Sequence, residues 1–321
     1  MSISVLGAGA FGTALAVTFA RTGSKVRLWG RDEKFMQKLT AEQSNKKYLP
    51  NASFPKSMSV SQDLESALDA DIILFAVPTQ KLSGLLEGVG QTLDEKLLVA
   101  CCKGIDLSTG QGPTAILSKY APECDAAILT GPSFATDLAA NMPTALTLAC
   151  KQMDAGKDLQ SALATPVLRI YTTTDVIGAE LGGAFKNVMA IACGICIGAG
   201  FGVSARAALM TRGYAEILRL ALAMGAKAET LSGLSGLGDL SLTCMSENSR
   251  NFRYGLALGR GQAFDPSVTV EGISTAHAAL EHPRFSKIDM PVTKIVHEIS
   301  KGTTDASSAM QKLMNRPQKE E

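Results

Sequence analysis

The sequence predicts an α/β fold, in which an N-terminal doubly wound sheet is followed by a C-terminal all-helical domain. Up to about residue 176, short apolar runs bounded by Pro, Gly or charge alternate with helical patterns. Beyond that point the strand patterns stop, and long segments rich in Ala, Leu, Met and Gly follow. The 321 residues also suffice for two domains of about 150 residues each. We therefore expect one domain over residues 1–176 and a second over residues 177–321.

The expected strands lack apolar–polar alternation, which is typical of strands buried on both faces of a parallel sheet. A helix over Phe11–Thr22 joins the first two, so we expect a mostly parallel sheet wound with helices. The strands are expected at Ser2–Leu6, Lys25–Trp29, Ile72–Val77, Leu97–Cys101, Ala127–Thr130 and Ala145–Leu148. Glycines break the C-terminal half into helices at Gly198–Gly202, Gly233–Gly238 and Gly259–Gly261. The polar tail from Asn315 to Glu321 is expected to fray.

Composition excludes several classes of partner. The net charge of +1 gives no strong global field to attract nucleic acid or an anionic membrane. Seven cysteines at irregular spacing favour reduced thiols, and hence a cytoplasmic protein, over a disulfide framework. Charged residues or glycines interrupt every apolar run before the roughly 18 residues that a membrane span needs. We therefore expect a soluble protein that binds any anionic ligand through local groups.

The glycine-rich stretch Gly7-Ala8-Gly9-Ala10-Phe11-Gly12 follows the first strand and opens a helix. This context is the one that a dinucleotide-binding GxGxxG motif requires, and it predicts a Rossmann-like domain. In such a motif Gly7 allows the tight turn, Gly9 lets a pyrophosphate approach the backbone, and Gly12 lets helix and strand pack closely. The alternative is a glycine-rich turn that binds no ligand.

The end of the second strand indicates which dinucleotide is preferred. An acid is usual there in NAD sites, whereas this chain has Trp29-Gly30-Arg31. Because an arginine favours a 2′-phosphate, we expect NADP(H) to be preferred. Asp32 could still accept from a ribose hydroxyl, so NAD(H) stays the alternative cofactor, and Arg31 could instead be a solvated loop residue.

Lys186 lies in ELGGAFKNVMAIACG, a stretch that is otherwise small, apolar or glycine apart from Glu180 and Asn187. Its helical neighbours Gly182, Gly183 and Ala190 are too short to cover an ammonium, and we expect the glycines to make space for a substrate. The alternative is a lysine that extends its charge to water.

Further candidate residues lie in two loops beyond the carboxyl ends of strands, where ligands gather in such folds, and in two motifs of the helical half. Each is alone an ordinary turn residue or helix cap. They are Lys103 in CCKG, Gly131 and Ser133 in GPSFA, Asp239 in GLGDL, and Ser249, Arg250 and Asn251 in NSRN.

A metal or redox site is not expected from the sequence. The three histidines, His277, His282 and His297, lie outside the motifs, and no His, Asp or Glu cluster shows ligand spacing. Cys193 and Cys196 form a CxxC inside the lysine helix, where we interpret them as core residues.

Taken together, GAGAFG, CCKG, GPSFA, GGAFKN, GLGDL, NSRN and VEG occur in this order over most of the chain. This set resembles the NAD(P)-dependent glycerol-3-phosphate dehydrogenases of the bacterial type. The resemblance implies reversible reduction of dihydroxyacetone phosphate to sn-glycerol 3-phosphate, which supplies phospholipid synthesis, and a homodimer.

The resemblance also implies residue roles, with Lys186 as the proton-transfer residue, Asp239 orienting its ammonium and Lys103 nearby. The implied cofactor positions are Ala10, Phe11, Arg31, Lys103, Ala135, Arg250, Thr269 and Glu271. The implied substrate positions are Lys103, Gly131, Ser133, Lys186, Asp239, Ser249, Arg250 and Asn251. Two positions depart from the family pattern: Ala10-Phe11 replaces Ser-Trp or Ser-Tyr, and Ser204 stands where Asn is expected.

Two other functions stay open. Another β-hydroxyacid dehydrogenase superfamily member would share the glycine loop and the lysine, but would need a carboxylate clamp instead of NSRN. A dinucleotide-sensing regulator would not need a lysine, an aspartate and an arginine in one cleft.

Overall fold

The computed structural model describes residues 1–93, 95–306, 308–309 and 311. The chain divides into two units: the first comprises Met1–Lys103 and Gln111–Glu180, and the second comprises Gly104–Gly110 and Leu181–Glu321. The division that we expect at residue 176 falls at the start of helix α8 (Val176–Gly198), whereas the units divide just inside that helix. The tail expected to fray lies outside the described residues.

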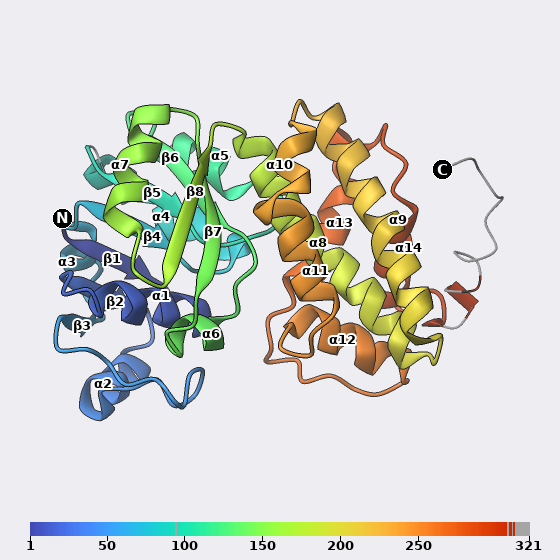
Figure 1. The fold of residues 1–321 in the computed structure, drawn as a ribbon, viewed down its shortest axis with the longest axis horizontal. Coiled ribbons are helices and arrows are strands. Elements are labelled where there is room, and N and C mark those ends of the chain that lie inside the picture. Colours follow the sequence, from blue (N-terminus) through green and yellow to red (C-terminus); the bar gives the residue numbers. More distant parts are fainter. Residues whose placement is uncertain (94, 307, 310, 312–321) are drawn as a thin grey trace. The chain divides into compact units, whose positions relative to one another are not determined.

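The first unit is built on an eight-stranded sheet with strand order β3-β2-β1-β4-β5-β6-β7-β8 (Figure 1). All neighbouring strands pair in parallel except β6 and β7. The order from β3 to β6 is that of a doubly wound dinucleotide-binding sheet, which reverses between β1 and β4. The predicted fold class is therefore confirmed. The strands are β1 (Ile3–Leu6), β2 (Val26–Trp29), β3 (Met58–Ser61), β4 (Ile72–Phe75), β5 (Leu97–Ala100), β6 (Ala126–Thr130), β7 (Thr144–Cys150) and β8 (Leu168–Thr173).

Two of these strands, β3 and β8, were not expected from the sequence. Strand β3 reads MSVS, which is short and half polar, and it pairs only at the sheet edge beside β2. Strand β8 reads LRIYTT and alternates between buried and exposed residues, as an edge strand with one solvated face does. Neither strand is a continuous apolar run, so the pattern that predicts the other strands does not predict these two.

Helices cover both faces of the sheet and bury two separate apolar clusters. One cluster includes residues of α1 (Ala10–Ala20), α2 (Glu33–Glu42), α6 (Ala135–Ala139) and α7 (Met153–Leu163). The other includes residues of α3 (Leu64–Leu68), α4 (Leu82–Leu86) and α5 (Pro113–Tyr120). Two 3-10 turns complete the unit, η1 (Thr79–Lys81) and η2 (Gly90–Leu93). The loops at the carboxyl ends of the strands therefore extend from a sheet that helices cover on both faces.

The described residues of the second unit form helices joined by turns and loops, with no strand among them, as expected (Figure 1). Its single large apolar cluster is centred on α8, and the short segment 104–110 contributes Ile105 to it. The other elements are α9 (Gly202–Ala223), α10 (Ala228–Ser232), the π-helical turn η3 (Leu234–Gly238), α11 (Asp239–Cys244), α12 (Arg250–Gly259), α13 (Glu271–Glu281), the 3-10 turn η4 (Pro283–Phe285) and α14 (Pro291–Ser300).

Helix α8 is long and apolar enough to cross a membrane by length and composition. The expectation that every apolar run is too short is wrong for this helix, because its glycines do not interrupt it. However, 89% of its most apolar window is buried within the protein. The position of α8 at the centre of the core accounts for its apolar composition. Its length and composition are therefore weak evidence for a membrane span.

Helices α8 and α12 approach closely along two pairs of glycines, each pair four residues apart. A Cβ atom added at Gly194 or Gly198 on α8, or at Gly255 or Gly259 on α12, would overlap backbone atoms of the facing helix. Only glycine permits two helix backbones to come this close. The contact fixes the position of α12 against the middle of α8.

We predict that Gly255→Ala destabilises the protein by about 1–3 kcal/mol, because the new methyl group would overlap the carbonyl oxygen of Ile191. Equilibrium denaturation in urea measures the loss. Gly84→Ala in α4 is the control, since a Cβ there meets no atom within 4 Å and alanine favours a helix. Equal stability of the two variants would refute the close approach of α8 and α12.

Candidate active site

The glycine loop between β1 and α1 has three glycines with three different environments. Gly7 has a φ of 126°, and a Cβ there would lie 2.7 Å from the carbonyl carbon of Ala76. A Cβ at Gly12 would overlap the carbonyl oxygen of Gly7, whereas a Cβ at Gly9 would meet nothing within 4 Å. The first and third glycines therefore serve the turn and the packing of α1, and Gly9 leaves open space above the loop.

The start of α1 offers backbone amides beside this open space. Gly9 is the N-cap of α1 and no side chain caps the helix. The first amides of a helix, here including those of Ala10 and Phe11, have no partner within the helix and carry its positive end. This arrangement fits a pyrophosphate and does not need the hydroxyl that the Ala10-Phe11 departure removes.

Arg31 and Asp32 follow β2 and differ in what their side chains do. Asp32 is the N-cap of α2, and its Oδ1 accepts from the amide of Phe35 at 3.0 Å. Its carboxylate is therefore engaged in capping the start of α2. Arg31 is exposed at the carboxyl end of the strand, where a dinucleotide ribose lies in such sheets.

Lys103, Gly131 and Ser133 come together after the neighbouring strands β5 and β6. Lys103 Nζ donates to the carbonyl oxygen of Gly131 at 3.5 Å, and Ser133 Oγ donates to the same oxygen at 3.3 Å. The parallel pairing of β5 and β6 brings these two loops to one edge of the sheet. Ala135 begins α6 directly after them. A cation and a hydroxyl thus lie side by side in the first unit.

Lys186 forms a buried ion pair in the second unit. Its Nζ lies 2.5 Å from Asp239 Oδ1 and donates to Thr243 Oγ1 at 3.0 Å. Lys186 is 8% exposed and Asp239 is not exposed at all. The interpretation of Lys186 as a lysine that extends into water is therefore wrong. Asp239 holds the ammonium, as the sequence predicts for an orienting carboxylate.

The turn η3, which directly precedes Asp239, lies against α8 because α8 has no side chain at Gly182. A Cβ at Gly182 would lie 2.5 Å from the carbonyl oxygen of Ser235, within η3. The expectation that the glycines beside Lys186 make space for a substrate is thus wrong for Gly182, whose space is filled by backbone. Thr243 was not predicted from the sequence. It lies one helical turn beyond Asp239 on α11, and this i,i+4 spacing is the sequence feature that could have indicated it.

Asn251 links three helices beside the lysine. Its Nδ2 donates to Oδ1 of Asn187 at 3.0 Å, and its Oδ1 accepts from the amide of Gly272 at 2.9 Å. Both asparagines are buried. Since Gly272 lies in the first turn of α13, Asn251 joins α12 to both α8 and α13. Asn187 was not singled out from the sequence, although it directly follows Lys186.

The remaining predicted residues of the second unit lie at helix starts. Ser249 is the N-cap of α12 and accepts from the amide of Phe252 at 3.2 Å. Arg250 is the first residue of α12 and is exposed. Glu271 is the first residue of α13, and Thr269 is exposed two residues before it. Arg250 therefore presents its charge at the positive end of a helix, which favours an anion.

The cysteines of α8 have the environment of core residues. Cys193 and Cys196 are both buried in the apolar cluster, and burial raises the pKa of Cys196 to about 11. A thiol with so high a pKa is a poor nucleophile. All seven cysteines are buried. Ser204, the second departure from the family pattern, is exposed in the first turn of α9.

Comparison with known proteins matches both halves of the chain. Residues 2–156 match the family model described as NAD-dependent glycerol-3-phosphate dehydrogenase N-terminus, and residues 175–311 match the corresponding C-terminus. The glycerol-3-phosphate dehydrogenases [NAD(P)+] of Ruegeria sp. (strain TM1040) and Roseobacter denitrificans are 54% and 52% identical, with 100% of each chain covered.

A solved structure agrees with these relatives. The 2.1 Å crystal structure of glycerol-3-phosphate dehydrogenase from Coxiella burnetii is 38% identical, has a TM-score of 0.93, and covers 98% of this chain and 99% of its own. The chain belongs to the family of NAD-dependent glycerol-3-phosphate dehydrogenases.

Proposed function

We propose that this protein catalyses the reversible NAD(P)H-dependent reduction of dihydroxyacetone phosphate to sn-glycerol 3-phosphate. The observation that carries the proposal is the buried ion pair of Lys186 and Asp239, in a chain whose close relatives are named as glycerol-3-phosphate dehydrogenases. An ammonium held in place away from water is a group that can pass a proton to a substrate.

The first unit supplies the groups that hold the pyrophosphate and the 2′-phosphate of the dinucleotide. The amides at the start of α1 receive the pyrophosphate, with Gly9 leaving room for it. Arg31 receives the 2′-phosphate, which makes NADP(H) the preferred cofactor and NAD(H) the alternative. When bound, the nicotinamide supplies the hydride that the carbonyl carbon receives. We assign further cofactor contacts to Lys103, Ala135, Arg250, Thr269 and Glu271.

Lys186 supplies the proton. As the carbonyl carbon gains the hydride, its oxygen becomes an alkoxide, and Lys186 Nζ donates a proton to it. Asp239 and Thr243 fix the direction of the ammonium through contacts of 2.5 and 3.0 Å. Positioned proton transfer of this kind contributes about 10²–10⁴-fold to a rate.

The substrate phosphate is held by Arg250 and the amides that begin α12. This combination of a guanidinium and a helix N-terminus suits a dianion and distinguishes the protein from enzymes that need a carboxylate clamp. We assign the other substrate contacts to Lys103, Gly131, Ser133, Ser249 and Asn251. Because the amide of Asn251 already bonds Asn187 and Gly272, this residue also positions the start of α12.

We further propose that the enzyme acts in the cytoplasm as a homodimer and that its product supplies glycerophospholipid synthesis. Seven buried cysteines at irregular spacing suit a reducing compartment.

A direct assay tests the proposed reaction. NADPH oxidation is followed at 340 nm with dihydroxyacetone phosphate, with unphosphorylated dihydroxyacetone and with a panel of keto acids. We expect turnover with dihydroxyacetone phosphate far above the others. Preferred turnover of a keto acid would favour another β-hydroxyacid dehydrogenase, and no turnover with any substrate would favour a dinucleotide-sensing regulator.

Replacing Lys186 by Met should lower kcat by ~10²-fold or more, because the alkoxide loses its proton donor. The variant should also lose about 3–5 kcal/mol of stability, since Asp239 stays buried without its counter-charge. The double variant Lys186→Met/Asp239→Asn removes both charges and should regain much of that stability while kcat stays low.

These effects are separated by measuring kcat below the Tm of each variant, together with the Kd for NADPH. Lys287→Met, at an exposed lysine, is the control and should leave kcat, the Tm and the Kd for NADPH unchanged. Recovery of kcat together with stability in the double variant would show that Lys186 acts only through folding.

Arg31→Asp should shift the ratio of kcat/KM from NADPH toward NADH by roughly 10–100-fold, because a charge-assisted contact to a phosphate contributes about 1.5–3 kcal/mol. Steady-state kinetics with both cofactors measure the ratio. Arg21→Asp, at an exposed arginine at the far end of α1, should leave it unchanged. An unaltered ratio in Arg31→Asp would mean that Arg31 is a solvated loop residue.

Arg250→Ala should raise KM for dihydroxyacetone phosphate by at least ~10-fold, since the phosphate loses a charged partner worth about 1.5–3 kcal/mol. Arg260→Ala is the matched control, because Arg260 is an exposed arginine at the other end of the same helix. If both variants kept the wild-type KM, the phosphate would have to be held elsewhere.

A further inference from the structure

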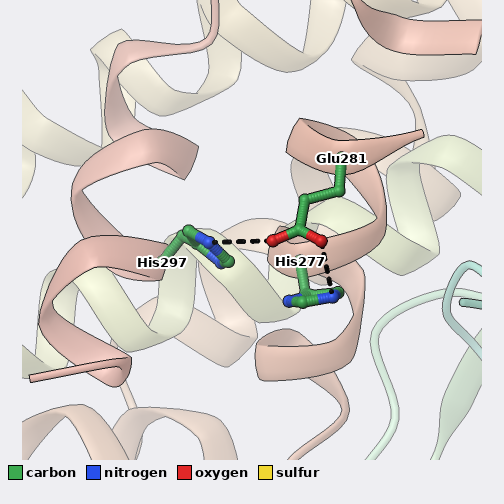
Figure 2. Close-up of side chains that lie close together, drawn as sticks. All are labelled: His277, Glu281 and His297. Carbon is green, nitrogen blue, oxygen red and sulfur yellow. Dashed lines mark ion pairs between the residues drawn. The ribbon is translucent and has the colours of Figure 1, made fainter. Parts of the chain in front are cut away.

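A cluster of two histidines and a glutamate lies on α13 and α14, outside the residues assigned to the reaction (Figure 2). His277 and Glu281 are one turn apart on α13, and His297 projects from α14 toward the same carboxylate. His277 Nε2 lies 3.1 Å from Glu281 Oε2, and His297 Nε2 lies 3.7 Å from Glu281 Oε1. The expectation that no His or Glu residues have ligand spacing is therefore wrong here.

We propose that His277, Glu281 and His297 form a binding site for one divalent transition-metal ion of the Zn²⁺ type. Two imidazole nitrogens and one carboxylate oxygen are a common three-ligand set for Zn²⁺. Mg²⁺ and Ca²⁺ prefer sites made of oxygen atoms alone, so the two histidines select against them.

The spacing of the ligand atoms fits a single ion. All three ligand atoms lie within 4.8 Å of one another. Bonds of about 2.0–2.1 Å in a tetrahedral site place neighbouring ligand atoms about 3.3–3.4 Å apart. The separations of 3.1 and 3.7 Å lie on either side of that value and run to different oxygens of Glu281, Oε2 for His277 and Oε1 for His297. A carboxylate that turns one oxygen toward both imidazoles, or that binds through both oxygens, would close the site around an ion.

The site is open to solvent on one side. The side chains of Glu281 and His277 are 52% and 38% exposed, whereas that of His297 is 14% exposed. An ion bound here keeps at least one position for water and exchanges with the medium. This arrangement differs from a structural zinc site, in which four protein ligands enclose the ion.

Lys301 competes with the ion for the carboxylate. Its Nζ lies 2.8 Å from Glu281 Oε1, the oxygen that also faces His297. Metal binding must displace this ammonium, so the lysine weakens the affinity without being a ligand. Removing the charge of Lys301 should therefore tighten binding, whereas a surface ion-pair network with no metal function would give no such effect.

Binding of the ion would join α13 to α14, which pack against each other. A ligand that binds only the folded state raises stability in proportion to the logarithm of its concentration over Kd. We therefore expect Zn²⁺ to raise the Tm of the protein.

The test uses the full chain, stripped of metal with a chelator and titrated with Zn²⁺ by calorimetry at pH 7.5. We expect one ion per chain. His297→Gln and Glu281→Gln should each weaken the Kd by at least ~10-fold, the loss that follows even from removing an outer partner of a metal ligand. Lys301→Met should tighten it. His282→Gln, at the histidine outside the cluster, should leave it unchanged.

Co²⁺ added to the wild type should give visible absorption bands typical of low coordination number, and Zn²⁺ should abolish them. This measurement does not depend on the folding of any variant. Equal Zn²⁺ affinity in the wild type, His297→Gln and Glu281→Gln would overturn the proposal. Unchanged or weaker affinity in Lys301→Met, or absence of the Co²⁺ bands, would also overturn it.

Discussion

The buried ion pair of Lys186 and Asp239 is the interaction on which the arrangement of the second unit depends. Taking two charges out of water costs several kcal/mol per ion, and only close contact with further hydrogen bonds offsets that cost. The 2.5 Å contact and the hydroxyl of Thr243 meet this requirement. The helix that carries the lysine and the turn that carries the aspartate must therefore be held in fixed register.

Close backbone packing provides that register. Gly182 lets the π-helical turn η3 lie directly on α8, and a π-helical turn is often found where a helix serves a functional site. Farther along α8, Gly194 and Gly198 let α12 approach in the same way. The buried amide of Asn251 then fastens α12 to α8 and α13. The helix starts that carry Arg250 and Glu271 are consequently positioned from the same helix as the lysine.

The two units offer different polar groups to the proposed ligands. In the first unit, backbone amides at the start of α1 act through the helix dipole, and glycine keeps them accessible. In the second unit, the proposed phosphate site combines the exposed Arg250 with the amides that begin α12, whereas Lys186 is buried in its ion pair. A net charge of +1 is compatible with the proposed binding of two phosphorylated ligands, because these groups act on a ligand in direct contact, well within a Debye length.

The sequence alone determined the fold class, six of the eight strands and the turn at the glycine loop, because turn glycines and buried apolar runs are local signals. It also singled out Lys186, an isolated charge in an apolar helix. Only the tertiary structure decided that Lys186 is paired and buried, that Gly182 accommodates backbone, and that Asn251 bonds Asn187 and Gly272. It also brought His297 to His277 and Glu281. Each of these facts joins residues that are far apart in the chain, and no local pattern of residues encodes which distant backbone or side chain will fill a given space.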